Sequence, residues 1–388
     1  MPPTVAIVAG EASGDLLGAA LIDALRERRP DLQFFGIAGP RMRAAGCEAF
    51  AATEELSVMG LVEILRHLPR LLKLRRRARE TILARKPDVF VGIDSPEFNL
   101  SVSGWLKQRG ISTVQYVSPQ VWAWRQGRVK HIGKAVDRVL CVLPFEVDFY
   151  SQHAVDARFV GHPLADQIPL QVDRAAARQA LGLPQDRQVV ALLPGSRMAE
   201  VELLGADFIA TAVTLARRRN PAPVFVAPMA NARVRAEFER QYREAGLEAP
   251  PLTLVDGQTH RVLAAADAVL VASGTATLET TLSRRPMVVA YRLGRITAFI
   301  ARELGLVKVQ HFSVPNLLAG EALVPEFFQE QVKPEALADA LEGWLDDPVA
   351  VQSLQQRFEQ LHLTLRREGA RAAADAVLEL IGPPAPAA

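Results

Sequence analysis

The sequence predicts an α/β protein of two domains, each built on a parallel β-sheet. Short β-branched apolar runs alternate with longer helical segments along most of the 388 residues, which is the pattern of repeated strand–helix–strand units. A chain of this length exceeds what one hydrophobic core usually supports. In each half, an apolar run ends in a turn rich in glycine and hydroxyl residues, at residues 10–15 and 274–279. We therefore expect two parallel sheets that face one interdomain cleft.

The strands are expected where short apolar runs meet turn residues. The first domain, residues 1–165, should contain six strands, at 4–9, 33–37, 88–93, 113–117, 138–143 and 158–160. A polar, alanine-rich stretch at 167–187 is interpreted as the linker and first helix of the second domain, residues 166–345. That domain should contain strands at 188–193, 223–227, 252–255, 268–271 and 287–290. Residues 346–388 should form helices that pack either on the first domain or on a partner subunit, before a frayed end.

Composition limits the class of protein. A hydrophobic content of 49% with 23% charged residues is typical of a globular protein, and a net charge of +2 is too small to indicate a nucleic-acid partner. Cys47 and Cys141 have no metal or disulfide spacing, which favours a reducing compartment. No signal peptide is recognisable, and no apolar stretch reaches the roughly 20 residues that span a bilayer. We expect a cytoplasmic protein.

A leucine-rich, basic segment at residues 61–79 departs from ordinary globular patterning. Its aliphatic residues recur on one helical face, and seven basic residues oppose Glu63 alone, which leaves 7 − 1 = +6. This combination suits a helix on an anionic membrane surface. The alternative is a core-facing helix with a solvated basic face, and Pro69 would kink that helix or start a second one. The expected membrane contacts are Leu61, Ile64, Leu65, Leu68, Leu72, Arg75 and Arg76.

Asp94 is the candidate for proton transfer. It follows the apolar run 89–93 and precedes Ser95 and Pro96, so it is expected at the carboxyl end of a buried strand, the edge where open α/β sheets bind ligands. A carboxylate there can accept a proton from a hydroxyl nucleophile. The alternative is that Asp94 caps the next turn. The nearby loop 10–15 can equally be a tight turn with Ser13 or Asp15 as helix N-cap.

The turn of the second half is the better candidate for binding an anion. Residues 273–277 offer small side chains, hydroxyls and a helix start without an acidic residue, and Glu279 follows where it can accept hydrogen bonds from a ribose diol. Arg197 ends the first strand run of the same domain, and an arginine at a sheet's carboxyl end suits a diphosphate. Alternatively, Arg197 pairs with Glu200 or Glu202 on the following helix.

Two of the four tryptophans, Trp122 and Trp124, stand on one side of an extended segment. They can line an acyl-chain or sugar groove, sit at a membrane interface, or simply belong to the core.

Eight strings taken together resemble the lipid-A-disaccharide synthase family, the glycosyltransferases of outer-membrane lipid A assembly. They are GEASGD at 10–15, LSVMGLVEIL at 56–65, GIDSPEFN at 92–99, YVSPQVWAWR at 116–125, VGHPL at 160–164, LLPGSR at 192–197, ASGTATLET at 272–280 and VPN at 314–316. Each string is weak alone, but eight in order are hard to reach by chance. The resemblance runs from about residue 4 to about residue 345.

The resemblance implies a GT-B-like arrangement of two Rossmann-type domains and an inverting transfer. In that family, 2,3-diacylglucosamine passes from its UDP derivative to the 6-hydroxyl of 2,3-diacylglucosamine 1-phosphate, giving a β-1,6 disaccharide and UDP. Asp94 matches the family's proposed base. The implied UDP-sugar contacts are Arg197, Ser273, Gly274, Thr275, Ala276, Thr277, Glu279 and Asn316, and the expected acceptor contacts are Glu11, Ser13, Gly14, Met59 and Trp122.

The partners expected from the resemblance are the two acylated sugar substrates, the anionic cytoplasmic face of the inner membrane and a second copy of the chain. No aspartate-rich DxD motif lies in a plausible loop, so we expect no essential metal ion and no cofactor. Two alternatives stay open. One is another GT-B-type enzyme, such as a UDP-N-acetylglucosamine 2-epimerase or a polyprenyl-linked glycosyltransferase, and the other is a non-catalytic protein that binds nucleotide sugar or lipid.

Overall fold

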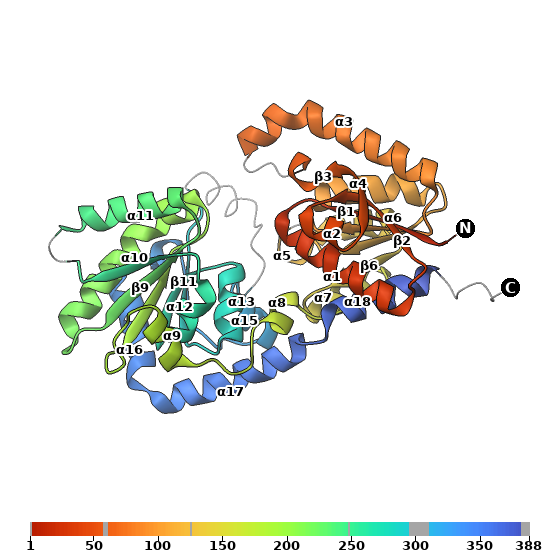
Figure 1. Ribbon diagram of the computed structural model, residues 1–388. Helices are drawn as coiled ribbons and strands as arrows, with labels where there is room; N and C mark the ends of the chain where they lie inside the picture. Colours follow the sequence, from red (N-terminus) through yellow and green to blue (C-terminus); the bar gives the residue numbers. More distant parts are fainter. Residues whose placement is uncertain (1, 57–60, 125, 247–248, 295–309, 382–388) are drawn as a thin grey trace. The chain divides into compact units, whose positions relative to one another are not determined.

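The computed structural model describes residues 2–56, 61–124, 126–246, 249–294 and 310–381, of which 61–67, 123, 124 and 126 are described by their backbone alone (Figure 1). The chain forms two compact units. The first contains Met1–Asp166 together with Leu365–Ala388, and the second contains Gln167–Thr364. The C-terminal segment expected as one block from residue 346 is therefore divided between the two units.

The first unit is built on a parallel sheet of seven strands in the order β3-β2-β1-β4-β5-β6-β7. The strands are β1 (Thr4–Ala9), β2 (Gln33–Ala38), β3 (Cys47–Ala52), β4 (Val89–Ile93), β5 (Ser112–Tyr116), β6 (Arg138–Cys141) and β7 (Ala157–Phe159). The direction of chain winding reverses between β1 and β4, which pair in parallel from Val5↔Val89 to Ala9↔Ile93. This reversal creates a topological switch point, where ligands bind in such sheets.

The helices of the first unit cover both faces of this sheet. They are α1 (Ala12–Arg28), α2 (Pro40–Ala44), α3 (Leu61–Arg85), α4 (Pro96–Lys107), α5 (Val121–Trp124), α6 (Val129–Ala135), α7 (Phe145–Ser151), α8 (Pro163–Gln167) and α18 (Gly369–Ile381). The longest of them, α3, continues through Pro69 as one helix. Its Leu74, Ala78 and Ile82 are buried in the core, so the second half of α3 is fixed on the unit.

The last helix, α18, packs against α1 although more than three hundred residues separate them. Arg138 at the start of β6 reaches the same helix, because its Nη1 donates to the Ala376 carbonyl at 2.6 Å and to Glu379 at 2.8 Å. The C-terminus is therefore a structural part of the first unit.

The second unit contains a parallel sheet of six strands in the order β10-β9-β8-β11-β12-β13. The strands are β8 (Val189–Leu193), β9 (Val224–Met229), β10 (Leu252–Asp256), β11 (Ala268–Ala272), β12 (Met287–Tyr291) and β13 (Glu326–Phe328). The helices described in this unit are α9 (Arg174–Ala180), α10 (Met198–Arg218), α11 (Ala232–Glu244), α12 (Thr259–Ala265), α13 (Thr275–Leu282), α15 (Val314–Ala319), α16 (Pro334–Asp346) and α17 (Pro348–Leu365).

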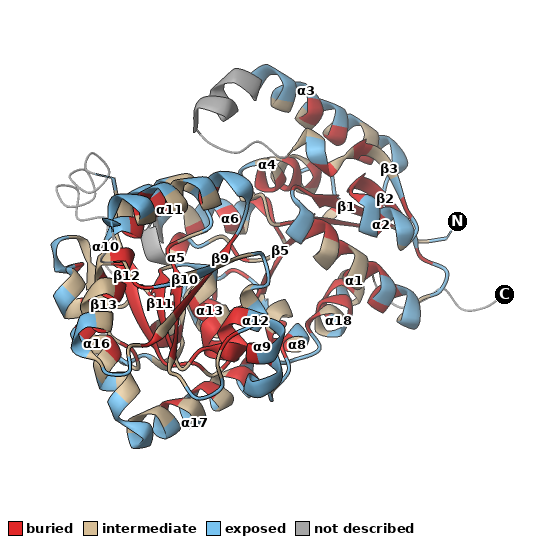
Figure 2. Cartoon of the chain, turned by 60° about the vertical axis from the view of Figure 1, so that its left-hand side comes forward, coloured by how far each residue is buried: buried red, intermediate tan, exposed pale blue. Residues whose placement is uncertain are grey.

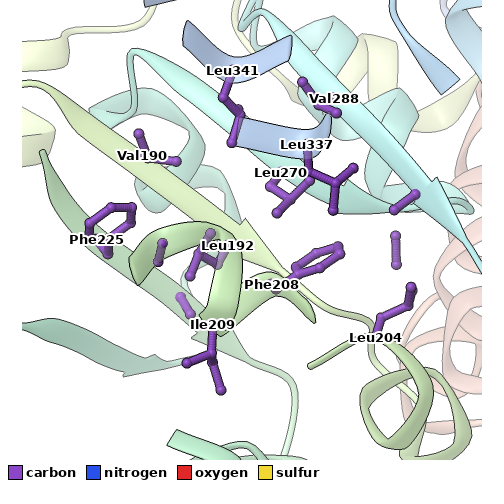
Figure 3. Close-up of a cluster of buried hydrophobic side chains, with 14 of the residues drawn as sticks. Val190, Leu192, Leu204, Phe208, Ile209, Phe225, Leu270, Val288, Leu337 and Leu341 are labelled. Carbon is purple, nitrogen blue, oxygen red and sulfur yellow. The ribbon is translucent and has the colours of Figure 1, made fainter. Parts of the chain in front are cut away.

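The central strands of both units are buried, whereas the outer faces of the helices are exposed (Figure 2). In the second unit, Leu192 and Leu270 of neighbouring strands meet Phe208 of α10 and Leu337 of α16 (Figure 3). Strands buried on both faces explain why their sequences are continuous apolar runs rather than alternating ones. The two predicted parallel sheets are confirmed. Among the described residues, no helix is long and apolar enough to cross a membrane.

Candidate active site

Asp94 lies in a turn that holds its backbone on both sides. Asp94 and Ser95 both have left-handed conformations, with φ of 51° and 42°. The Asp94 N–H donates to the Tyr116 carbonyl at 2.9 Å, and the Asp94 carbonyl accepts from Asn99 Nδ2 at 2.8 Å and from Gln115 Nε2 at 3.0 Å. Such strain in a side chain-bearing residue persists only where the surroundings enforce it. The turn therefore fixes the backbone position from which the half-buried side chain of Asp94 extends.

Ser95, and not Asp94, occupies the N-cap position of α4, and its side chain makes no cap hydrogen bond. Loop 10–15 lies against the same turn, because a Cβ on Gly10 would come within 1.9 Å of Ser95 Oγ. Glu11 and Ser13 are exposed there, with Glu11 as the N-cap of α1. Gly14 is buried, and a Cβ on it would touch Ala9 at 3.4 Å, which gives that glycine a packing role.

Asp15 of the same loop has a structural task. Its carboxylate accepts from the backbone N–H groups of Gly39 at 2.9 Å, Arg41 at 2.9 Å and Met42 at 3.1 Å. It thereby joins α1 to the start of α2, and only 3% of the residue is exposed. Of the two acidic residues in segment 10–15, only Glu11 is therefore exposed.

Trp122 is half-buried at the carboxyl edge of the first sheet. Its Nε1–H donates to Glu146 at 3.1 Å, and its ring meets Phe145 edge-on at 4.9 Å. Glu146 also accepts from the Leu143 N–H at 3.1 Å. Burial raises the pKa of the Glu146 carboxyl to about 7. Sequence reasoning missed Glu146, although it follows the apolar run 138–143 much as Asp94 follows its own run. Met59 and the side chain of Trp124 lie outside the described residues.

The loop between β11 and α13 presents its backbone. Gly274 has φ of 145°, a conformation that favours glycine, and among the described residues no atom beyond its chain neighbours lies within 4 Å of where its Cβ would be. Gly274 and Thr275 are exposed at the N-terminus of α13, with Ala276 half-buried behind them. Because the first N–H groups of a helix lack intrahelical partners, this end of α13 favours an anion.

The other hydroxyl residues of this loop point inward. Ser273 Oγ donates to the Phe312 carbonyl at 3.0 Å. Thr277 is fully buried, and its Oγ1 donates to the Gly274 carbonyl at 2.8 Å and accepts from the Val314 N–H at 3.3 Å. These two side chains fix the loop, so a ligand would meet the exposed backbone and Thr275.

Arg197 is the cation at the same edge of the second sheet. Its guanidinium is 83% exposed and lies 3.4 Å from Glu200, so the pairing considered from sequence does form. An exposed pair of this kind is worth about 0–1 kcal/mol and leaves the guanidinium available to an anion. Burial raises the pKa of Tyr291 at the end of β12, with Glu200 adding to the rise and Arg197 opposing it, which places this tyrosine beside the pair.

Glu279 lies one turn into α13, 3.8 Å from His260 Nε2. Burial raises the pKa of the Glu279 carboxyl, against the opposing effect of His260. His260 also borders a cavity of about 560 Å³ between α9 and α12, whose floor includes Ile168 and Ala176. The exposed loop residues Gly274 and Thr275 are not among the residues lining that cavity.

Asn316 is fully buried and uses its amide on the backbone. Its Nδ2 donates to the Val324 carbonyl at 2.9 Å, and its Oδ1 accepts from the N–H groups of Leu323 at 2.9 Å and Val324 at 3.0 Å. The expected direct contact with UDP would require these bonds to be exchanged, so in this structure Asn316 holds the turn after α15. The described parts of the chain contain no group of three or more His, Cys, Asp or Glu residues able to hold a metal ion.

Comparison with known proteins gives one consistent family. A model of the lipid-A-disaccharide synthetase family matches residues 5–379. The lipid-A-disaccharide synthase of Pseudomonas aeruginosa strain UCBPP-PA14 is 53% identical over 377 residues, covering 97% of this chain and 98% of that protein.

Solved structures with a similar fold are far less similar in sequence. The UDP-GlcNAc 2-epimerase of Neisseria meningitidis bound to UDP-GlcNAc has a TM-score of 0.62 at 12% identity, covering 97% of this chain and 98% of the other. A glycosyltransferase of Rickettsia africae ESF-5 has a TM-score of 0.60 at 10% identity, covering 98% of each chain. These two show the fold alone, and with them the GT-B-like class of two Rossmann-type units is confirmed.

Proposed function

The chain belongs to the lipid-A-disaccharide synthase family, and we propose that it transfers 2,3-diacylglucosamine from UDP-2,3-diacylglucosamine to 2,3-diacylglucosamine 1-phosphate. The products are the β-1,6-linked disaccharide 1-phosphate and UDP. The family match favours this transferase activity over the two alternatives, an epimerase and a non-catalytic binding protein. The geometry that supports a catalytic role is a strained, doubly anchored turn that presents the Asp94 carboxylate.

In the proposed reaction, Asp94 acts as the general base. The acceptor's 6-hydroxyl oxygen forms a bond to the anomeric carbon of the donor while its proton passes to the Asp94 carboxylate. The bond from the anomeric carbon to the diphosphate oxygen breaks on the opposite face, and its electron pair leaves with UDP. Attack opposite the leaving group inverts the anomeric centre. Glu11 and Ser13, exposed beside this turn, are proposed to orient the acceptor, together with Gly14, Met59 and Trp122.

The donor's diphosphate is proposed to bind the exposed loop of the second unit. Arg197 supplies a cation, and the backbone at Gly274 and Thr275 supplies N–H donors at the start of α13. Both are in place before reaction and stabilise the charge that grows on the leaving group. Glu279 is proposed to accept hydrogen bonds from the ribose diol, while Ser273, Ala276, Thr277 and Asn316 shape the loop.

We further propose that α3 lies on the anionic cytoplasmic face of the inner membrane. Leu68 and Leu72 on α3 are each 43% exposed, and the side chain of Arg76 is 82% exposed. An apolar strip beside basic residues is the arrangement that interfacial helices use. Leu61, Ile64 and Leu65 belong to the proposed contact on their sequence alone, because their side chains lie outside the description.

One assay separates this function from its rivals: release of UDP from UDP-2,3-diacylglucosamine, with and without the acylated sugar phosphate. A lipid-A-disaccharide synthase releases UDP at an appreciable rate only when the acceptor is present, with one disaccharide formed per UDP. Release that ignores the acceptor would contradict the transfer, and epimerised donor without a disaccharide would identify an epimerase. Binding of UDP without any turnover would identify a non-catalytic binder.

A further inference from the structure

A cluster of arginines surrounds one tryptophan where α3 packs on α4 (Figure 1). Arg109, just after α4, has its Cζ 3.6 Å from the centre of the Trp105 ring, and Arg79 of α3 has its Cζ 5.8 Å from the same centre. Arg79 also donates to Ser101 Oγ at 2.8 Å, and Arg109 donates to the Trp105 carbonyl at 2.9 Å. Together with Arg75, these residues form what we name the Trp105 cluster.

The Trp105 cluster carries positive charge that no described carboxylate pairs with. Arg79 Nε is buried and lacks a hydrogen-bond partner within the described residues. Burial lowers the pKa of Arg79, and the charges of Arg75 and Arg109 lower it further. Two other arginines of α3 are paired with carboxylates, Arg76 with Glu80 at 2.8 Å and Arg85 with Glu48 at 2.7 Å, whereas Arg70 and Arg77 donate to backbone carbonyls. Three neighbouring guanidinium groups and one orphaned donor are an arrangement that a bound anion would stabilise.

The position of the cluster indicates which anion. Leu68, Leu72, Arg75 and Arg79 stand at spacings of four, three and four residues, so they form one stripe along α3. The exposed leucines occupy its first half and the unpaired arginines its second. A bilayer surface has the same sequence of chemistries, from acyl chains to phosphate groups, and tryptophan concentrates at the boundary between them. The order of leucines and arginines along α3 thus corresponds to the order of acyl chains and phosphate groups in a bilayer surface.

We propose that the Trp105 cluster binds the phosphate group of an anionic lipid headgroup, with Arg75, Arg79 and Arg109 as its donors and Trp105 as the surface beneath them. This rests on the membrane contact of α3 proposed above and extends it onto α4. Guanidinium groups suit the task because their planar fork can give two hydrogen bonds to one phosphate. A bound headgroup would orient α3 with its leucine end toward the acyl chains.

The test compares Arg109→Gln with Arg233→Gln, an equal loss of charge at an exposed residue of the second unit. Each protein is sedimented with vesicles of phosphatidylcholine containing one-third phosphatidylglycerol. Loss of one lipid-facing charge should weaken partitioning about fivefold in Arg109→Gln, the equivalent of about 1 kcal/mol, and leave Arg233→Gln at the wild-type value. Equal partitioning of the two variants would contradict binding of a lipid headgroup by the Trp105 cluster.

A second arm asks whether phosphate itself is recognised. Inorganic phosphate is titrated against bound vesicles while sodium chloride keeps the ionic strength constant. If the cluster is a phosphate site, phosphate releases the wild-type protein more readily than chloride and has no such advantage with Arg109→Gln. Equal release by both salts would mean general electrostatic attraction and would overturn the site.

Two controls separate this inference from its rivals. Arg109→Lys keeps the charge and loses the planar fork, so partial retention of vesicle binding is expected, whereas a purely structural arginine would show a lowered melting temperature and wild-type binding. Transfer activity is measured on detergent-dispersed substrates, where Arg109→Gln should match wild type. A wild type that binds vesicles without transferring sugar would contradict the proposed transfer and leave this inference standing. One that transfers sugar without binding anionic vesicles would overturn this inference together with the membrane contact of α3, and leave the proposed transfer standing.

Discussion

The two units each contain a turn between a buried strand and a helix, and the two turns expose different parts of the chain. In both, a buried strand ends in a turn that leads into a helix, at Asp94 before α4 and at Gly274 before α13. At Asp94 three hydrogen bonds hold the backbone, and the side chain is what remains to be presented. At Gly274 the side chains of Ser273 and Thr277 are turned inward, and the backbone is what remains. The first turn, with its backbone held, exposes a carboxylate. The second turn, with its side chains held, exposes backbone N–H donors.

Replacing the presented side chain of the first turn should have the largest effect. Asp94→Asn keeps the size of the side chain and cannot take the proton, so kcat should fall by ~10²-fold or more. UDP affinity, measured by calorimetry, should stay at the wild-type value because the donor loop is untouched. Activity within a few fold of wild type would remove Asp94 as the base.

Removing the exposed cation of the second turn should act on binding. Arg197→Ala should weaken UDP binding by roughly 1.5–3 kcal/mol, the scale of a charge-assisted hydrogen bond. Glu202→Ala, a charge change on the same helix, serves as the control and should bind UDP normally. If calorimetry shows an unchanged UDP affinity for Arg197→Ala, then Arg197 does not bind UDP and serves only in the ion pair with Glu200.

Removing the hydrogen bonds that support each turn should have smaller effects, on kcat at the first turn and on UDP affinity at the second. Asn99→Ala removes the amide that donates to the Ile93 and Asp94 carbonyls and should lower kcat by about tenfold at unchanged UDP affinity, about 1.4 kcal/mol, which lies within the net value of two hydrogen bonds. Ser273→Ala should weaken UDP binding by a similar factor and leave the rate at saturating donor near wild type. Each is measured by kinetics and calorimetry, and identical profiles for the two variants would break the contrast drawn here.

Glu146 offers the smallest expected effect on catalysis and a distinct pH signature. Burial raises its pKa from 4.5 to about 7, so between these values the unfolded chain loses a proton that the folded protein retains. The contribution of Glu146 to the stability of the wild type should therefore slope downward as pH rises from about 5 to about 7, whereas buried His162, whose pKa is lowered to about 4, contributes an upward slope in the same range. Glu146→Gln should lose the downward contribution in thermal melts while kcat changes only a few fold. A loss of turnover as large as that of Asp94→Asn would make Glu146 the better base.

Local pattern predicted the central strands well because strands buried on both faces are written as unbroken apolar runs. The run at 4–9 coincides with β1. Strand β3, Cys-Glu-Ala-Phe-Ala-Ala, was missed because it is an edge strand without β-branched residues, and β13, Glu-Phe-Phe, was missed because it is a shorter edge strand that also lacks them.

The candidate site was predicted where a residue's position on a strand end decides its role, as for Asp94 and Gly274. It could not be predicted where distant partners decide. Nothing near Asn316 in the sequence reveals that residues 323 and 324 occupy its amide. Likewise, the spacing of Arg79 predicts a helical face but does not reveal that Arg79 and Arg109, which follows α4, meet at the same Trp105 ring.

The pairing of α18 with α1 has a consequence for biosynthesis. A ribosome delivers Arg138 and α1 early, yet the helix that covers α1 and accepts the Arg138 hydrogen bonds follows the whole second unit, Gln167–Thr364, in the chain. Until then, the nascent first unit holds an uncovered helix face and an arginine destined for burial without its partner, the kind of intermediate that chaperones bind. Completion of the amino-terminal unit therefore waits until the second unit has been synthesised.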